Sequence, residues 1–131
     1  MGIDASGRQL ATVERTLEVL TALEELDGAG VTELAEHLDL SKAAVHNHLS
    51  TLEANNFVVQ EGQDYALGLR LMAMGEYVKH QNELYQAGQS AVDDLAERTG
   101  EYAHLMAVEH GLGFHVYKAQ GPEAVAEAFH Y

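Results

Sequence analysis

Apolar residues between positions 31 and 69 first recur at helical spacing and then alternate, which predicts two helices followed by a ribbon. Thr32 is expected to open the first helix, in which Leu34, Ala35 and Leu38 share one face. Asp39 comes where the chain must turn, and Asp tolerates the left-handed conformation that such turns need. The pattern therefore predicts a short helix that ends in a tight turn.

A second helix is predicted directly after this turn. Ser41 is a good N-cap, because its side-chain oxygen can accept from a free backbone N–H of the first helical turn. Val45, Leu49 and Leu52 then recur at i, i+4 and i+7, which predicts a buried seam. A ribbon follows, with its turn at Gly62-Gln63.

Helix, turn, helix and ribbon in this order are typical of a winged helix-turn-helix, whose second helix enters the DNA major groove. The residues opposite the buried seam are small or polar, and Gln63 is the one candidate contact in the acidic tip of the ribbon. We predict these DNA-binding residues: Thr32, Ser41, Lys42, Ala43, His46, Asn47, Ser50 and Gln63.

The flanking helices carry more apolar surface than one small domain needs. The first helix, about residues 8–26, has apolar stripes on two nearly opposite sides, and residues 69–79 are apolar almost all round. The second stripe either covers the ribbon or, as we favour, forms a dimer contact. The predicted dimer interface comprises Leu10, Val13, Leu17, Val19, Leu23, Leu26, Leu71, Met74 and Val78.

The last third of the chain predicts a helix and a hairpin. Leu84, Gly88, Ala91 and Leu95 repeat at helical spacing, and Thr99-Gly100 ends the helix. Residues 102–108 and 114–119 read as strands, with a turn at 109–113. The fold class is mainly α with a small antiparallel β component, α+β. Its parts are a winged helix-turn-helix (1–68), a helix (69–82) and a helix with a hairpin (83–131).

The order of residues resembles the IclR family of transcription regulators. The segments VERTLEVLTALEEL, VTELAEHLDLSKAAVHNHLSTLEANNFV, DYALGLRLMAMG and LYQAGQSAVDDLAERTGEYAHLMAVEHG carry the resemblance from about Thr12 to Ala119. YALGLRL and LAERTGE are its more specific parts. The resemblance implies a dimeric DNA-binding regulator. In it, residues 69–82 form a linker helix, and residues 83–131 form a partial α/β effector-type domain, the start of an effector-binding domain.

Two features depart from the resembled family. That effector domain normally continues well beyond the hairpin, so we expect a truncated form or a fragment, and a small-molecule effector does not follow for this chain. In the second helix, Ala44 stands where the family has Thr or Ser, and Asn47 where it has Arg. Asn47 can still bond an adenine edge bidentately.

The charge balance is the opposite of the basic footprint expected of a DNA-binding protein. Seven Lys and Arg face 21 Asp and Glu, a net charge of −14, and Lys42 is the only Lys or Arg between Gly28 and Gly68. Either the protein does not bind DNA, or it works in a very salty cell interior, where the Debye length falls to ~3 Å at 1 M salt. The resemblance favours the second reading, a halophilic protein.

Composition excludes several other classes. Hydrophobic residues make up 47% of the 131-residue chain, enough for a packed core. No apolar run has the ~20 residues of a membrane span, and nothing resembles a secretion signal. A cytoplasmic location without membrane contact is therefore expected. The chain has no cysteine.

No catalytic motif, metal-ligand spacing or cofactor motif is present, so we predict no enzyme activity, no metal and no cofactor. His46 and His48 point to different sides of their helix. His104 and His115, on paired strands, come close only if the strand register brings them together.

Three function classes remain open. The favoured one is an IclR-type transcription regulator that binds double-stranded DNA as a homodimer, or as a tetramer. The second is a winged-helix interaction module that heterodimerises with full-length regulators without binding DNA. The third is a sensor of a small molecule or a metal.

Overall fold

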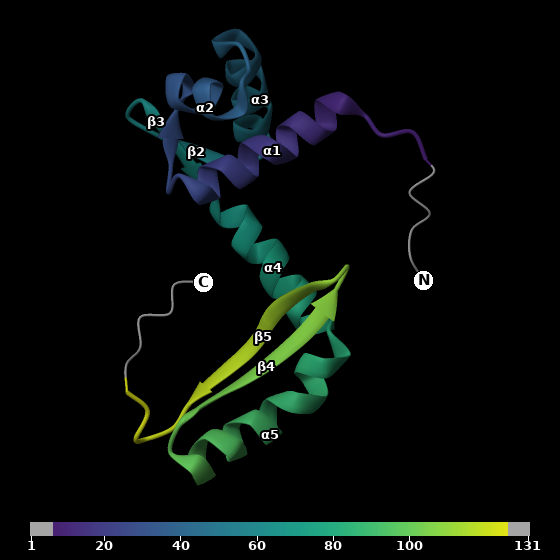
Figure 1. The fold of residues 1–131 in the computed structure, drawn as a ribbon, viewed down its shortest axis with the longest axis vertical. Helices are drawn as coiled ribbons and strands as arrows, with labels where there is room; N and C mark the ends of the chain where they lie inside the picture. Colours follow the sequence, from purple (N-terminus) through teal and green to yellow (C-terminus); the bar gives the residue numbers. More distant parts are fainter. Residues whose placement is uncertain (1–6, 126–131) are drawn as a thin grey trace. The chain divides into compact units, whose positions relative to one another are not determined.

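The computed structural model describes residues 7–125, which divide between residues 73 and 74 into two compact units (Figure 1). Each unit has its own core. The first contains three helices and a three-stranded sheet, and the second contains a helix and a hairpin. The predicted α+β class is confirmed. Within the described residues, no helix is both long and apolar enough to cross a membrane.

Three helices, α1 (Ala11–Glu25), α2 (Val31–Leu38) and α3 (Lys42–Ala54), make up most of the first unit. Helix α1 packs against both others. The turn between α2 and α3 is confirmed, because Asp39 is left-handed at φ 53° and ψ 47°. Helix α2 begins at Val31, one residue before the predicted Thr32, and Gly30 is its N-cap.

The wing is a small antiparallel sheet in the order β1-β3-β2, built from β1 (Ala29–Gly30), β2 (Val58–Glu61) and β3 (Asp64–Leu67). Glu61 pairs with Asp64, which leaves Gly62 and Gln63 as a two-residue turn. Gly62 takes φ +65°, a conformation suited to the first central position of such turns. The predicted ribbon and its turn are confirmed.

One hydrophobic core holds these elements together. The predicted seam of Val45, Leu49 and Leu52 is buried in it, as are Leu34 and Ala35 of α2. Full burial of such a side chain stabilises a fold by about 1.5–3 kcal/mol. The described buried residues of this core are Val19, Ala22, Leu23, Ala29, Leu34, Ala35, Val45, Leu49, Leu52, Val58 and Tyr65.

This core corrects part of the predicted dimer interface. Val19 and Leu23 are 0% and 1% exposed, and Leu26 packs against the same core. The second apolar stripe of α1 therefore covers the wing and the two neighbouring helices of its own chain. The assignment of Val19 and Leu23 to a dimer contact is wrong, because a side chain without exposed surface cannot contact a partner.

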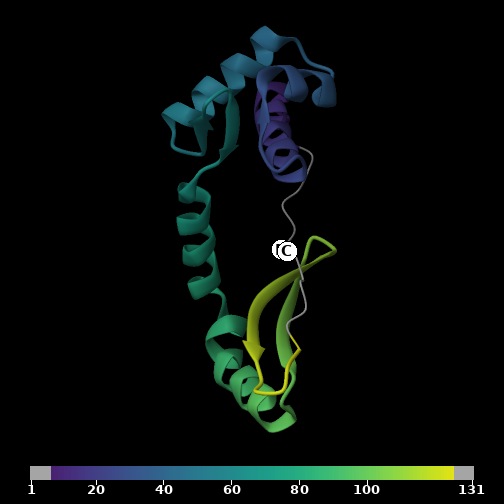
Figure 2. The same cartoon turned by 90° about the vertical axis from the view of Figure 1, so that its left-hand side faces the viewer.

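The second unit is formed by α5 (Glu83–Thr99) and the hairpin of β4 (Tyr102–Glu109) and β5 (Leu112–Gln120), and α4 (Leu69–Gln81) leads into it. Helix α5 lies along one face of the hairpin (Figure 2). Asn82 caps α5 by accepting from the Tyr85 N–H at 3.1 Å, and Gly100 ends it in the left-handed conformation.

Two details of the second unit differ from prediction. The buried residues of α5 are Tyr85, Val92 and Ala96, whereas Leu84 and Leu95 of the expected repeat are exposed. The repeat spacing identified the helix but selected the wrong face. The strands also reach further than predicted and leave only His110 and Gly111, both with positive φ, to form the turn.

Candidate nucleic-acid interface

The face of α3 opposite the core is exposed and polar. Six of the predicted DNA-binding residues lie at its N-terminus or along this face, and all of them are exposed: Ser41, Lys42, Ala43, His46, Asn47 and Ser50. Thr32 is exposed in the first turn of α2, and Gln63 is exposed at the wing tip. The first unit thus presents every predicted contact residue to solvent.

Local contacts hold α3 in place. The Ser41 hydroxyl oxygen accepts from the Ala44 N–H at 3.1 Å, so the predicted N-cap is confirmed. On the side towards α1, Nδ1 of His48 lies 2.8 Å from Oγ1 of Thr16. Helix α3 is therefore bound to α1 by a polar contact as well as by its apolar seam.

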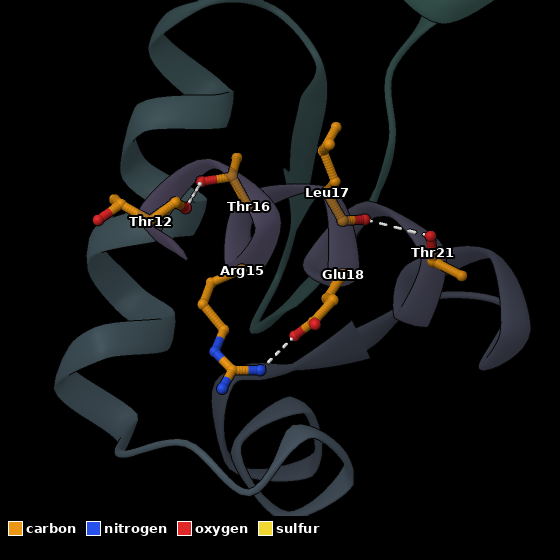
Figure 3. Close-up of polar contacts among 6 residues, drawn as sticks. All are labelled: Thr12, Arg15, Thr16, Leu17, Glu18 and Thr21. Carbon is orange, nitrogen blue, oxygen red and sulfur yellow. Dashed lines mark hydrogen bonds and ion pairs between the residues drawn. The ribbon is translucent and has the colours of Figure 1, made fainter. Parts of the chain in front are cut away.

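Helix α1 presents its own polar contacts on the surface (Figure 3). The Thr16 hydroxyl donates to the Thr12 carbonyl at 2.9 Å, and the Thr21 hydroxyl donates to the Leu17 carbonyl at 3.1 Å. Arg15 and Glu18 form an ion pair of 2.7 Å, which raises the pKa of the arginine. Both partners are exposed, so this ion pair adds little to stability.

The root of the wing is fixed by Arg70 and Gly68. Arg70 donates to the Asn55 carbonyl at 3.0 Å, and its guanidinium lies 5.0 Å from the centre of the Phe57 ring. Gly68 donates to the Phe57 carbonyl at 2.8 Å, and a Cβ there would lie 2.8 Å from the Asn56 carbonyl oxygen. Only glycine fits this close approach.

A second exposed surface is apolar. On α1, Leu10, Val13 and Leu17 are 60%, 50% and 57% exposed and line shallow grooves along the helix. No described residue of α4 is buried. Of the α4 residues predicted at a dimer interface, Met74 and Val78 are exposed and Leu71 is half-buried. Soluble monomers rarely leave apolar stripes of this kind uncovered.

The second unit brings together polar groups from different segments of the chain. The Tyr117 hydroxyl donates to the Asp93 carboxylate at 2.5 Å, and this bond raises the pKa of the tyrosine. The rings of His104 and His115 lie 5.2 Å apart, centre to centre. Only the strand register joins these two histidines, so no spacing within the sequence identified them.

An open pocket of about 350 Å³ also lies in the second unit. The end of α4 contributes Val78 and Lys79 to its lining, and the hairpin contributes Ala107, Glu109 and Phe114. Its surface is mainly apolar. Lys79 and Glu109 are the charged residues in the lining.

Comparisons with known proteins agree with this geometry. Residues 12–62 match the family model described as the IclR helix-turn-helix domain. The probable HTH-type transcriptional regulator ArcR of Halobacterium salinarum is 32% identical over 94% of this chain and 47% of its own length. The HTH-type transcriptional regulator XynR of Escherichia coli is 28% identical over 86% of this chain and 46% of its own.

Solved structures show the same fold. The crystal structure of an IclR transcriptional regulator from Alicyclobacillus acidocaldarius superposes with a TM-score of 0.72 at 26% identity, covering 88% of this chain and 48% of that one. The chain thus spans about half the length of the curated relatives it matches. The likeness to ArcR covers 94% of this chain and so extends well beyond the helix-turn-helix domain. The chain belongs to the IclR family, and residues 12–62 are its helix-turn-helix domain.

Proposed function

We propose that this protein is a transcription regulator that binds double-stranded DNA with α3 in the major groove. The observation that carries the proposal is the exposed polar face of an N-capped α3, seated on a closed core within an IclR helix-turn-helix domain. Relatives over the same region are named transcriptional regulators. In the proposed complex, the side chains of Asn47 and His46 form hydrogen bonds with base edges, and the charge of Lys42 contacts a phosphate.

The proposed roles of Asn47 and Lys42 differ in a measurable way. Loss of a good bidentate base contact costs about 1–3 kcal/mol at the specific site, so Asn47→Ala should weaken specific binding and leave random DNA almost unaffected. Lys42→Ala should weaken both about equally. Glu97→Ala, on the exposed surface of α5, is the matched control and should change neither affinity.

The experiment is a binding titration of the four proteins against DNA from upstream of the protein's own reading frame and against random DNA. If Asn47→Ala weakens the affinity for both DNAs equally, Asn47 does not contact a base. Absence of binding to any DNA, at every salt concentration up to saturation, would overturn the proposed function itself.

We also propose that the regulator is a homodimer joined through the exposed stripe of α1 and the exposed residues of α4. The apolar stripe of Leu10, Val13 and Leu17 supports this proposal, as does the lack of a buried residue in α4. Two recognition helices related by a two-fold axis would read half-sites one helical turn apart on a palindromic operator.

The proposed setting is a cytoplasm of high salt content. The first 80 residues carry thirteen acids and five bases, a charge of −8, and residues 81–131 carry eight acids and two bases, a charge of −6. Such a surface repels phosphate at low ionic strength. Concentrated salt screens this repulsion, so that hydrogen bonds and shape, more than counterion release, would determine affinity. The likeness to a protein of Halobacterium salinarum supports the same setting.

A further inference from the structure

We propose that His104, Met106 and His115 form a binding site for a cuprous ion on the outer face of the β4–β5 hairpin. The site lies in the second unit, apart from the helix-turn-helix domain, and does not depend on DNA binding. It rests on three observations: the strand register, the contact between two imidazoles, and the chemical character of the three side chains.

The register places these side chains on one face. Ala103, Leu105 and Tyr117 pack against α5. Successive side chains of a strand point to opposite faces, so His104 and Met106 point away from the helix. His115 is the direct cross-strand partner of Met106 and shares its face, because the register shifts by one residue between the Leu105–Tyr117 and Met106–His115 pairs.

The two imidazoles already lie at the spacing that a shared ion requires. Their ring centres are 5.2 Å apart and their planes meet at 67°. Two imidazoles that bind one ion with metal–nitrogen distances of about 2 Å have ring centres roughly 5 Å apart when the angle at the metal is tetrahedral. The observed spacing of the two rings therefore matches that of two imidazoles on one tetrahedral ion.

Met106, the cross-strand partner of His115, is the proposed third ligand. Its terminal methyl lies towards the hairpin turn, 3.5 Å from the position of a Cβ at Gly113. Binding therefore requires the side chain to rotate, and its three rotatable bonds allow the sulfur to turn towards the histidines. A thioether with two neutral imidazoles is a soft donor set, which selects monovalent copper over zinc or magnesium.

The surroundings tolerate one added positive charge. Lys118 is paired with His104 in the register, and its ammonium lies 4.2 Å from the centre of the Tyr102 ring. The attraction between this ammonium and the ring holds the lysine at Tyr102. Residues 81–131 carry a charge of −6, which favours a cation. Within the described residues, no three His, Asp or Glu side chains form a competing cluster.

The test is an anaerobic titration of the whole chain with cuprous ion against a chromophoric copper chelator. The unmodified chain should take up one equivalent. His104→Ala and His115→Ala should each weaken this binding at least tenfold, whereas His46→Ala, the control, should leave it unchanged. Met106→Leu should weaken cuprous binding but leave the weaker binding of zinc unaltered, because only the thioether distinguishes the two metals.

Melting curves of each variant show whether the second unit stays folded. If His104→Ala or His115→Ala unfolds the second unit, the proposal is tested by the conservative Met106→Leu variant alone. Its ratio of cuprous to zinc affinity should then be lower than that of the unmodified chain. Cuprous binding that is equal in the His104→Ala, His115→Ala and His46→Ala variants would overturn the proposal. If the ratio of cuprous to zinc affinity is unchanged in Met106→Leu, the Met106 sulfur is not a ligand, and the proposed selectivity for copper is contradicted.

Discussion

Thr16 of α1 and His48 of α3 are joined by a hydrogen bond of 2.8 Å between Oγ1 and Nδ1. The Thr16 hydroxyl also lies 2.9 Å from the Thr12 carbonyl oxygen. The hydroxyl can bond both partners at once only when it donates to Thr12 and accepts from Nδ1 of His48, so we predict the tautomer of His48 with its proton on Nδ1. The contact joins α3 to α1.

Replacing Thr16 with Val removes this acceptor while keeping the shape of the side chain. We expect a loss of about 1 kcal/mol in the free energy of unfolding, because a half-buried N–H is left without its partner. Thr21→Val is the matched control, since the Thr21 hydroxyl bonds only within α1. Denaturant titration measures both, and nitrogen NMR of His48 should show Nδ1 protonated. A neutral His48 protonated on Nε2 would contradict the assignment.

The close approach at the root of the wing makes a second prediction. In Gly68→Ala the new Cβ would meet the Asn56 carbonyl oxygen at 2.8 Å, so the backbone must move. Overpacking of this kind costs about 1–3 kcal/mol. Gly75→Ala, in α4 with nothing within 4 Å of the new Cβ, should instead stabilise the helix by roughly 0.5–1 kcal/mol. Melting temperatures that move in the same direction for both variants would refute the close-contact explanation.

The exposed stripe of α1 predicts the oligomeric state. Val13→Glu combined with Leu17→Glu places two charges in the proposed interface and should give a monomer that keeps its fold, since neither residue belongs to the core. Glu24→Gln, exposed on the same helix, is the control and should stay dimeric. Light scattering at micromolar concentration in high salt provides the measurement. If the unmodified chain is already monomeric under these conditions, the dimer proposal is contradicted.

The bond between Tyr117 and Asp93 predicts a change in stability at alkaline pH. The bond to the carboxylate raises the pKa of Tyr117 above its ordinary 10.0, so folding favours the neutral phenol. The resulting stabilisation is complete below about pH 10 and is lost as the pH rises through the higher, folded-state pKa. The stability of Tyr117→Phe should therefore fall less at alkaline pH than that of the unmodified chain. Tyr77→Phe, the control, should show the same fall as the unmodified chain. Melting curves between pH 8 and pH 12 test the pair, and identical profiles would argue against the bond.

The charge of −14 predicts an unusual response to salt. Stability should rise as potassium chloride increases from about 0.1 M to 2 M, because the screening length shrinks from ~10 Å to below ~3 Å over this range. Specific DNA binding should fall far less steeply with salt than it does for a basic DNA-binding protein. Paired melting curves and binding isotherms measure both responses. A melting temperature indifferent to salt, together with a steep loss of affinity, would rule out adaptation to a salty interior.

The sequence alone determined the features that depend on neighbours along the chain. The left-handed turn at Asp39, the cap at Ser41 and the seam of Val45, Leu49 and Leu52 follow from residue type and helical spacing, because the partners lie within one or two helical turns. The ribbon of β2 and β3 was predictable for the same reason, whereas the pairing of the distant β1 with β3 was not predicted. The predicted boundaries at residues 68 and 82 stay predictions.

Only the tertiary structure decided which surfaces meet. Helix α1 has two apolar stripes that are alike in sequence, and packing against α2, α3 and the wing buries Val19 and Leu23 while leaving Val13 and Leu17 exposed. The contact between His104 and His115 likewise depends on the register of two strands. Spacing along one strand or helix fixes which residues share a face, but the partner of that face comes from a distant segment, and its register is set by the packing of the whole unit.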